Sequence, residues 1–154
     1  STDFKPIVMD VLARLVERDV LIKIIQTGRT LREHERHLVS GASRASRSKH
    51  LPRELRGHIA GTADDGKSDA IDVCPFRTWQ LVGPDKLQWK TDDAEAKAAF
   101  ACIGELGEAM GLRWGGRWTN PYDPGHLEWL FAGEHYADIP HSSAAWLMHG
   151  GTLI

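Results

Sequence analysis

The chain has 154 residues, of which 42% are hydrophobic and 26% charged, and its formal net charge is -2. These values fit one globular domain with a core of ordinary size, and they give no general reason to expect nucleic-acid binding. No stretch approaches the roughly 18 uninterrupted apolar residues of a membrane span. The first residues also lack the pattern of a secretion signal. We therefore expect a single domain over residues 1–154.

The first 25 residues predict a helix followed by a strand. Apolar side chains recur at helical spacing from about residue 3 to residue 18, which predicts one apolar helix face. That face consists of Ile7, Val8, Val11, Leu12, Leu15 and Val16. Residues 20–25 (VLIKII) are rich in β-branched side chains, so we expect a largely buried strand there.

A second helix is predicted from a capping box, because Glu33 lies three residues after Thr30. It should end near Ser40, with Leu31 and Leu38 facing inward.

The middle of the chain predicts two loops and one strand. Residues 41–48 are small and basic, and residues 51–67 are polar with Pro and Gly, so both predict loops, the second a possible insertion. Residues 70–73 (AIDV) predict a strand that places Ile71 on one face and Asp72 on the other.

The second half predicts a hairpin over residues 79–89, a helix over 93–110 and two strands. The helix should be capped by Thr91 or Asp92 and end at Gly111. Its expected apolar side is Ala94, Ala98, Cys102, Leu106 and Met110. Two strands are expected: one over 112–118, which includes a glycine turn, and one over 126–130. A short helix is expected over 144–148. The two cysteines, Cys74 and Cys102, do not form a Cys-x-x-Cys pair and are expected to be free.

Three residues in different segments form a candidate zinc site: His50, Asp72 and His126. Two imidazoles and one carboxylate leave a fourth position for water on a catalytic zinc, which lowers the pKa of that water towards about 7. His58 and Asp65 are a competing pair with compact spacing. We prefer Asp72, because a strand fixes a ligand more rigidly than a polar loop does.

Asp123 precedes His126 by three positions and is a candidate general base, which would take a proton from water and pass it to the leaving amine. It also fits a turn aspartate, since Asp before Pro-Gly is common in turns. Glu128 shares a strand face with His126. It is a rival base, although we favour a role as hydrogen-bond acceptor from a ligand histidine. Arg29 could stabilise an oxyanion, bind a substrate carboxylate or form a surface salt bridge.

The ordered motifs resemble a known family. They are Ser48-x-His50, Ala70-x-Asp72, Trp114-Gly115-Gly116-x-Trp118 and Asp123-x-x-His126-x-Glu128. Together they resemble the D-Ala-D-Ala carboxypeptidase (M15) family of zinc peptidases, which cleave peptidoglycan peptides. Gln26-x-x-Arg29-Thr30 and Gly41-x-Ser43 are similar to its phage-lysin branch.

The resemblance implies a hedgehog/D-Ala-D-Ala peptidase-like α+β fold, a small antiparallel sheet with packed helices. It implies that His50, Asp72 and His126 bind Zn²⁺, that Asp123 is the catalytic base and that Arg29 binds substrate. The gap from His50 to Asp72 is 22 positions (72 − 50), much longer than is usual in the family.

The resemblance therefore predicts a zinc metallopeptidase acting on bacterial peptidoglycan. The expected protein is a bacteriophage endolysin that cleaves the L-Ala-D-Glu bond of the stem peptide. A D-Ala-D-Ala carboxypeptidase of the same family and a non-catalytic zinc-binding domain are the alternatives. Such an endolysin would be a monomer made in the host cytoplasm, and it would act on the cell wall after release. Neither a nucleic-acid partner nor a membrane span is expected.

Overall fold

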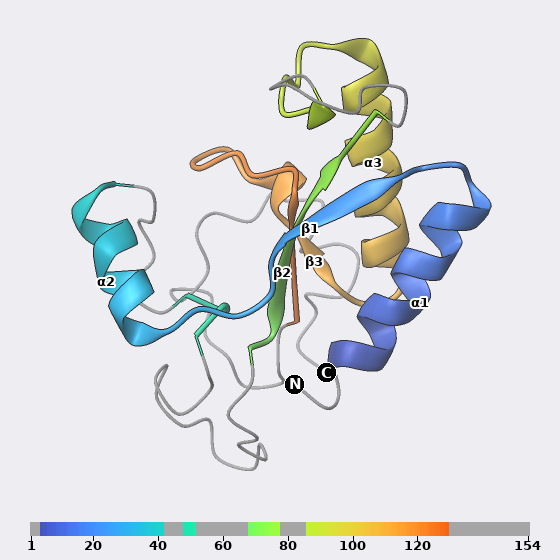
Figure 1. Cartoon of the computed structure of the whole chain (residues 1–154). Coiled ribbons are helices and arrows are strands. Elements are labelled where there is room, and N and C mark those ends of the chain that lie inside the picture. Colours follow the sequence, from blue (N-terminus) through green and yellow to red (C-terminus); the bar gives the residue numbers. More distant parts are fainter. Residues whose placement is uncertain (1–3, 42–47, 52–67, 78–85, 130–154) are drawn as a thin grey trace.

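The computed structural model describes residues 4–41, 48–51, 68–77 and 86–129, and Figure 1 shows their arrangement. In chain order the elements are α1 (Phe4–Glu17), β1 (Ile22–Gln26), α2 (Leu31–Val39), β2 (Ala70–Pro75), α3 (Ala94–Ala109), β3 (Arg113–Trp114), the 3-10 helix η3 (Gly115–Arg117) and β4 (His126–Glu128). Several predictions lie outside the described residues: most of the basic loop, the 52–67 segment with His58 and Asp65, the tip of the hairpin and the helix over 144–148.

The four strands form one antiparallel sheet in the order β1-β2-β4-β3. Helices and sheet together confirm the expected α+β fold. The register pairs Asp72 of β2 with His126 of β4, and Glu128 of β4 with Arg113 of β3. No helix among the described residues is long and apolar enough to cross a membrane.

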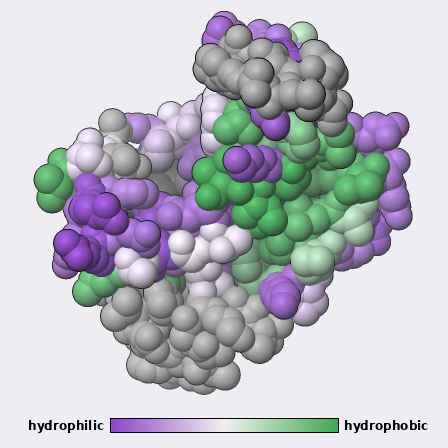
Figure 2. All heavy atoms as spheres, in the orientation of Figure 1, coloured by the Kyte–Doolittle hydropathy of each residue, from purple (hydrophilic) through white to green (hydrophobic). Residues whose placement is uncertain are grey.

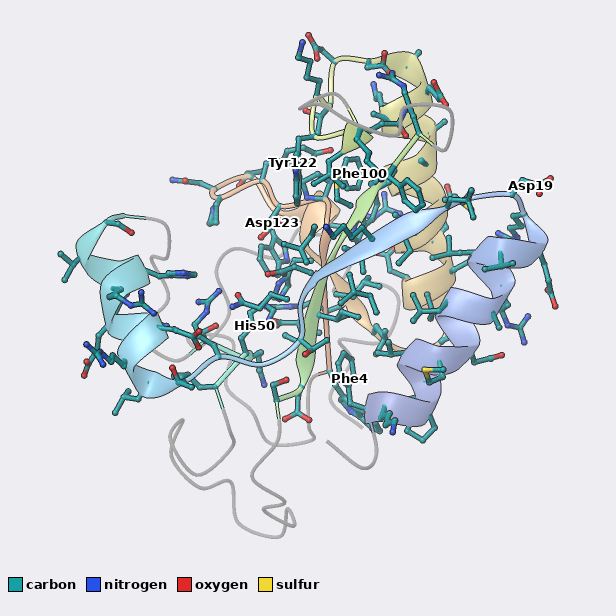
Figure 3. All side chains as sticks on the ribbon, viewed as in Figure 1. Phe4, Asp19, His50, Phe100, Tyr122 and Asp123 are labelled. Carbon is teal, nitrogen blue, oxygen red and sulfur yellow. The ribbon has the colours of Figure 1, made fainter. Side chains whose placement is uncertain are left out.

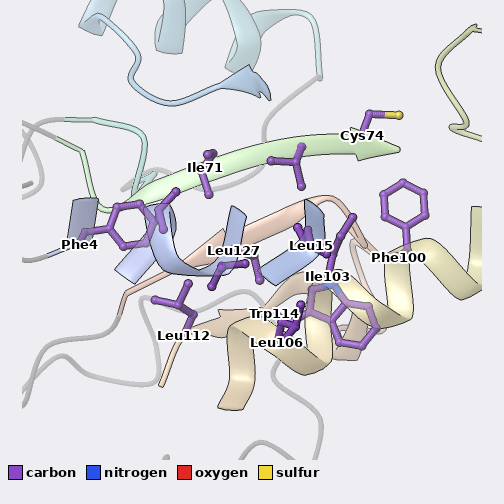
Figure 4. Packing of buried hydrophobic residues seen from close by; sticks show 13 residues of the cluster. Phe4, Leu15, Ile71, Cys74, Phe100, Ile103, Leu106, Leu112, Trp114 and Leu127 are labelled. Atoms are coloured by element: carbon purple, nitrogen blue, oxygen red, sulfur yellow. The ribbon is translucent and has the colours of Figure 1, made fainter. Parts of the chain in front are cut away.

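The hydrophobic core lies between the sheet and the two helices α1 and α3, which pack on the same side of it (Figures 1 and 4). Ile71 and Val73 of β2 point into this core, as their alternation with Asp72 predicted. α2 lies on the other side of the sheet (Figure 1). Because side chains alternate along a strand, Asp72 points away from the core formed with α1 and α3.

The helix α1 is confirmed, with Val8, Val11 and Leu15 buried. Val16, which was expected on the apolar face, is 63% exposed. The prediction that β1 is largely buried is wrong, since Ile24 and Ile25 are 45% and 41% exposed. The reason is position: β1 is an edge strand of this sheet, paired only with β2 among the described strands.

The capping box of α2 is confirmed, and both of its hydrogen bonds are present. The Thr30 hydroxyl accepts a hydrogen bond from the Glu33 N–H at 3.2 Å, and the Glu33 carboxylate accepts one from the Thr30 N–H at 2.8 Å. The expected inward face is wrong, because Leu31 and Leu38 are 47% and 40% exposed. His34 is the buried residue of this helix instead.

The helix α3 is confirmed, but its N-cap is Asp93 and its buried side differs from the expected one. The buried residues are Ala96, Phe100, Ile103, Gly104, Leu106 and Gly107, of which only Leu106 was expected. A Cβ on Gly104 would lie 2.0 Å from the Trp114 ring, and one on Gly107 would lie 2.6 Å from Leu127. The two glycines thus let α3 approach β3 and β4 closely, which a pattern based on apolar side chains alone does not detect.

Two smaller predictions are also confirmed. Gly111, which follows α3, has a φ of 83°, a conformation that favours glycine at a helix end. Cys74 is buried, Cys102 is half-buried, and both are free.

Candidate metal centre

Three side chains converge on the sheet face opposite α1 and α3. Nε2 of His50 lies 3.1 Å from Oδ1 and 3.1 Å from Oδ2 of Asp72, and Nδ1 of His126 lies 2.8 Å from Oδ1 of Asp72. One possible ligand atom from each residue lies within 4.8 Å of the other two. The structure therefore brings the three predicted ligand residues together, although 22 positions (72 − 50) separate the first two along the chain.

The sheet register explains why two of the three side chains lie together. Asp72 and His126 are directly paired on the antiparallel strands β2 and β4, so their side chains lie on the same face of the sheet. His50 comes from the short segment 48–51, which backbone hydrogen bonds fix on both sides. The N–H of Arg29 donates to the carbonyl of His50 at 2.8 Å, and the N–H of Asp69 donates to the carbonyl of Lys49 at 3.0 Å.

The second ring nitrogen of each histidine also has a partner. Nδ1 of His50 lies 3.4 Å from the carbonyl oxygen of Thr27, and Nε2 of His126 lies 2.8 Å from Oε2 of Glu128. Such contacts fix the tautomer and orientation of metal-binding imidazoles. Glu128 therefore lies where the hydrogen-bond acceptor of a ligand histidine was expected.

Electrostatics favours a cation at this position. Burial would raise the pKa of Asp72, but hydrogen bonds from His126 and His50 hold it well below its usual range. Burial lowers the pKa of His126, yet hydrogen bonds to Asp72 and Glu128 raise it to about 10. The raised pKa favours a positively charged His126 beside the Asp72 carboxylate in the metal-free protein. A divalent cation held by the two imidazoles and the carboxylate would take the place of that positive charge, and this donor set fits zinc.

The loop that carries Asp123 is held by close backbone contacts. The indole N–H of Trp114 donates to the Pro124 carbonyl at 2.8 Å. A Cβ on Gly115 would lie 2.3 Å from the Asp123 carbonyl oxygen, and one on Gly125 would lie 2.4 Å from the Val73 carbonyl oxygen. Glycine at both positions lets the loop lie directly against η3 and β2.

Asp123 itself is half-buried beside the cluster (Figure 3). Burial raises the pKa of its carboxyl group; the positive charge of His126 opposes this, and the nearby Asp72 adds to it. A carboxylate whose pKa lies above its ordinary value is a better proton acceptor and donor near neutral pH. The backbone carbonyl of Asp123 accepts a hydrogen bond from the His126 N–H at 3.2 Å, as in a turn, and the role of this residue as a base stays a prediction.

Arg29 and His50 both line a cavity of about 600 Å³. Nε of Arg29 donates to the side-chain oxygen of Gln26 at 3.2 Å, which orients the guanidinium. The lining also includes apolar residues of α1 and β1, namely Phe4, Val8, Met9, Leu12 and Ile24. Figure 2 shows hydrophobic side chains gathered in this region.

Sequence reasoning did not identify Arg113. This side chain is 1% exposed and forms an ion pair with Oε1 of Glu128. Burial raises the pKa of Glu128, but the charge of Arg113 and the hydrogen bond from His126 outweigh it and lower the pKa to about 2. The available signal was an arginine between Leu112 and Trp114 in a predicted strand. Because a charge is rarely buried without a partner, an arginine at such a position predicts an ion pair.

Two comparisons with known proteins bear on this site. Residues 66–129 match a family model described as D-alanyl-D-alanine carboxypeptidase, and this stretch contains Asp72, Asp123 and His126. The fold is similar to the crystal structure of the Serratia marcescens L-Ala D-Glu endopeptidase ChiX, with a TM-score of 0.50, 20% sequence identity and 79% of each chain covered. The first match points to the M15 peptidases over residues 66–129, and the second shows a similar fold. No curated protein sequence matches the chain. The M15 match includes two of the three candidate ligands, and His50 lies outside it.

Proposed function

We propose that this chain is a zinc-dependent peptidoglycan peptidase of the M15 family, which cleaves the L-Ala-D-Glu bond of the stem peptide. The observation that carries the proposal is the convergence of His50, Asp72 and His126 within 4.8 Å. Similarity to the fold of an L-Ala D-Glu endopeptidase supports the choice of bond. The half-buried Asp123 beside the cluster supports hydrolysis over a purely structural metal site.

Each residue has a defined part in this proposal. His50, Asp72 and His126 hold the ion, which supplies Lewis acidity and activates water when bound. Asp123 accepts the proton of the attacking water and delivers it to the leaving amine. Arg29, which lines the cavity and is held by Gln26, binds a carboxylate of the peptide. The cavity beside His50 then receives the chain on one side of the scissile bond.

The proposal extends to biological context. We infer a monomeric bacteriophage endolysin, made in the host cytoplasm and acting on the cell wall after release. The motifs shared with the phage-lysin branch support this inference, as does an aspartate at position 123, where several carboxypeptidase-like relatives have glutamate.

A second candidate is a D-Ala-D-Ala carboxypeptidase, which the description of the matching family model favours. Digestion of purified peptidoglycan by the zinc-loaded protein, with mass analysis of the products, separates the two. Endopeptidase activity releases peptides that begin with D-Glu and leaves L-Ala on the glycan. Release of free D-Ala alone would overturn the proposed bond, and no release by a zinc-loaded protein would indicate a non-catalytic zinc domain.

The role of Asp123 is tested by Asp123→Asn, which keeps size and polarity but cannot accept a proton. We expect the rate of peptide release to fall by about 10²- to 10⁴-fold, the usual contribution of a general base. Zinc content should remain unchanged, because Asp123 is not one of the proposed ligands. Asp92→Asn, at an exposed turn before α3, is the matched control and should keep full activity. Equal rates in the two variants would exclude Asp123 as the base.

A further inference from the structure

Arg113 is a buried charged residue placed one strand away from the metal centre. It lies on β3, directly paired with Glu128 of β4, and its side chain is 1% exposed. Burying a guanidinium without a partner is strongly unfavourable, so its position has to be explained by what it contacts. Neither the family motifs nor the proposed chemistry assigns it a role.

Two lines of contact run from Arg113 to His126. Along the first, Arg113 forms an ion pair with Oε1 of Glu128, and Oε2 of the same carboxylate lies 2.8 Å from Nε2 of His126. Along the second, the guanidinium lies 4.8 Å from the ring centroid of Trp118, and the Trp118 and His126 rings are 5.1 Å apart with a tilt of 48°. The two lines reach different parts of the same imidazole.

These contacts restrict the His126 ring in two independent ways. The Glu128 carboxylate fixes the direction in which Nε2 points, and the Trp118 ring limits rotation of the imidazole plane. Nδ1 is then directed at Asp72, 2.8 Å away. Because Arg113 contacts both Glu128 and Trp118, loss of its side chain removes support from both restraints at once.

We propose that Arg113 is a positioning residue of the metal centre, which orients His126 through Glu128 and Trp118. The inference rests on the proposed zinc site, and it predicts that Arg113 controls metal affinity without touching the metal. Outer partners of ligand histidines commonly change metal affinity by about 10- to 100-fold when they are lost.

Arg117 provides a matched control. It also combines an ion pair with stacking on a tryptophan, since its Nη2 lies 2.9 Å from Glu108 and its guanidinium lies 5.1 Å from the Trp114 ring centroid. Neither of these partners is Glu128 or Trp118. Arg117→Met therefore removes the same kinds of contact four positions along the chain, while both restraints on His126 remain.

The experiment compares Arg113→Met, Arg113→Lys and Arg117→Met with the wild-type chain. Zinc affinity is measured by competition with a chromophoric chelator. The proton on Nε2 of His126 is followed by NMR, because a hydrogen-bonded imidazole N–H gives a resolved downfield resonance. We expect Arg113→Met to bind zinc about 10- to 100-fold more weakly and to shift or lose this resonance. Arg113→Lys should restore affinity to within about threefold of wild type, and Arg117→Met should leave both readouts unchanged.

Zinc affinity and an Nε2–H resonance that are unchanged in Arg113→Met, with only thermal stability reduced, would overturn the inference. If Arg113→Met does not fold, Arg113→Gln carries the test, since glutamine keeps a polar side chain there but has neither the charge paired with Glu128 nor the guanidinium over Trp118. We expect it to bind zinc at least about tenfold more weakly, and wild-type affinity in that variant would refute a positioning role.

Neither readout uses a substrate, so the proposed peptidase function and the proposed role of Arg113 can be refuted independently. A wild-type protein that binds zinc but releases no peptide contradicts the proposed function, and the variant series still decides the role of Arg113. If the wild-type protein binds no zinc, the zinc proposal fails, and the His126 resonance of the metal-free protein decides whether Arg113 orients the ring.

Discussion

Gly125 makes a close contact that the site depends on, and Gly125→Ala tests this directly. A Cβ at this position would lie 2.4 Å from the Val73 carbonyl oxygen, whereas ordinary contacts begin at 3.4 Å. The loop must therefore move about 1 Å from β2 to admit a methyl group. The Gly125 carbonyl also accepts a hydrogen bond from the Val73 N–H at 2.9 Å, which that movement would stretch beyond bonding distance.

Overpacking usually costs about 1–3 kcal/mol, and the weakened hydrogen bond adds about 1 kcal/mol, so we expect the free energy of unfolding to fall by about 2–4 kcal/mol. A typical domain has about 5–15 kcal/mol of stability and stays folded after such a loss. His126 follows Gly125 directly, and metal ligation tolerates only about 0.2 Å of displacement. Zinc affinity should therefore fall at least about tenfold.

The measurements are urea unfolding of the metal-free protein and zinc competition titration. Gly28→Ala is the control, because its Cβ would lie 3.8 Å from the Ser68 hydroxyl, an ordinary contact at a position also close to the site. If Gly125→Ala matches Gly28→Ala in both unfolding free energy and zinc affinity, the close approach of the loop to β2 does not hold the site together.

Three further predictions use the same methods. Asp72→Asn should abolish stoichiometric zinc binding while retaining the helical circular dichroism of the fold, because the carboxylate is the charged member of the cluster. In the metal-free protein the raised pKa of His126, about 10, stabilises the fold below its unfolded value of 6.5, and this contribution is lost as pH rises towards 10. Urea unfolding at pH 6 and pH 9.5 should show lower stability at the higher pH, and the difference should become smaller in His126→Asn, where the raised pKa of Cys74 still contributes. Burial raises the pKa of Cys74 to about 11, so this thiol should react with a chromogenic disulfide reagent at pH 8 only after unfolding.

The sequence allowed prediction of the parts of this fold that depend on local chemistry. A capping box, a glycine helix end and an alternating strand each have a signature within a few residues, and Thr30, Gly111 and Ile71 show them. Asp72 could be chosen as a ligand for the same reason, because residues 70–73 alone predict the strand that contains it. The structure pairs it with His126, as that choice required.

The wrong predictions concern which face of an element is buried, and that depends on distant partners. The buried face of α3 contains Gly104 and Gly107, because the Trp114 ring and the Leu127 side chain fill the space above them. In a helix rich in alanine, several faces look equally apolar until its partner is known. β1 likewise reads as a buried strand, yet an edge position leaves Ile24 exposed. Arg113 was overlooked for the same reason, since its partner Glu128 is on another strand.

The register between β2 and β4 connects fold and site. A slip of one residue would place Leu127 opposite Asp72 and turn His126 towards the core, because side chains alternate along a strand. The structure resists this slip at two points: the hydrogen bond from Val73 to the Gly125 carbonyl, and the burial of Leu127 between the sheet and α3. Leu127 lies against Gly107, where a Cβ would be 2.6 Å from Cδ2 of the leucine, so a larger residue in α3 would displace this side chain. A helix residue on one face of the sheet thus helps to hold a candidate metal ligand in place on the other.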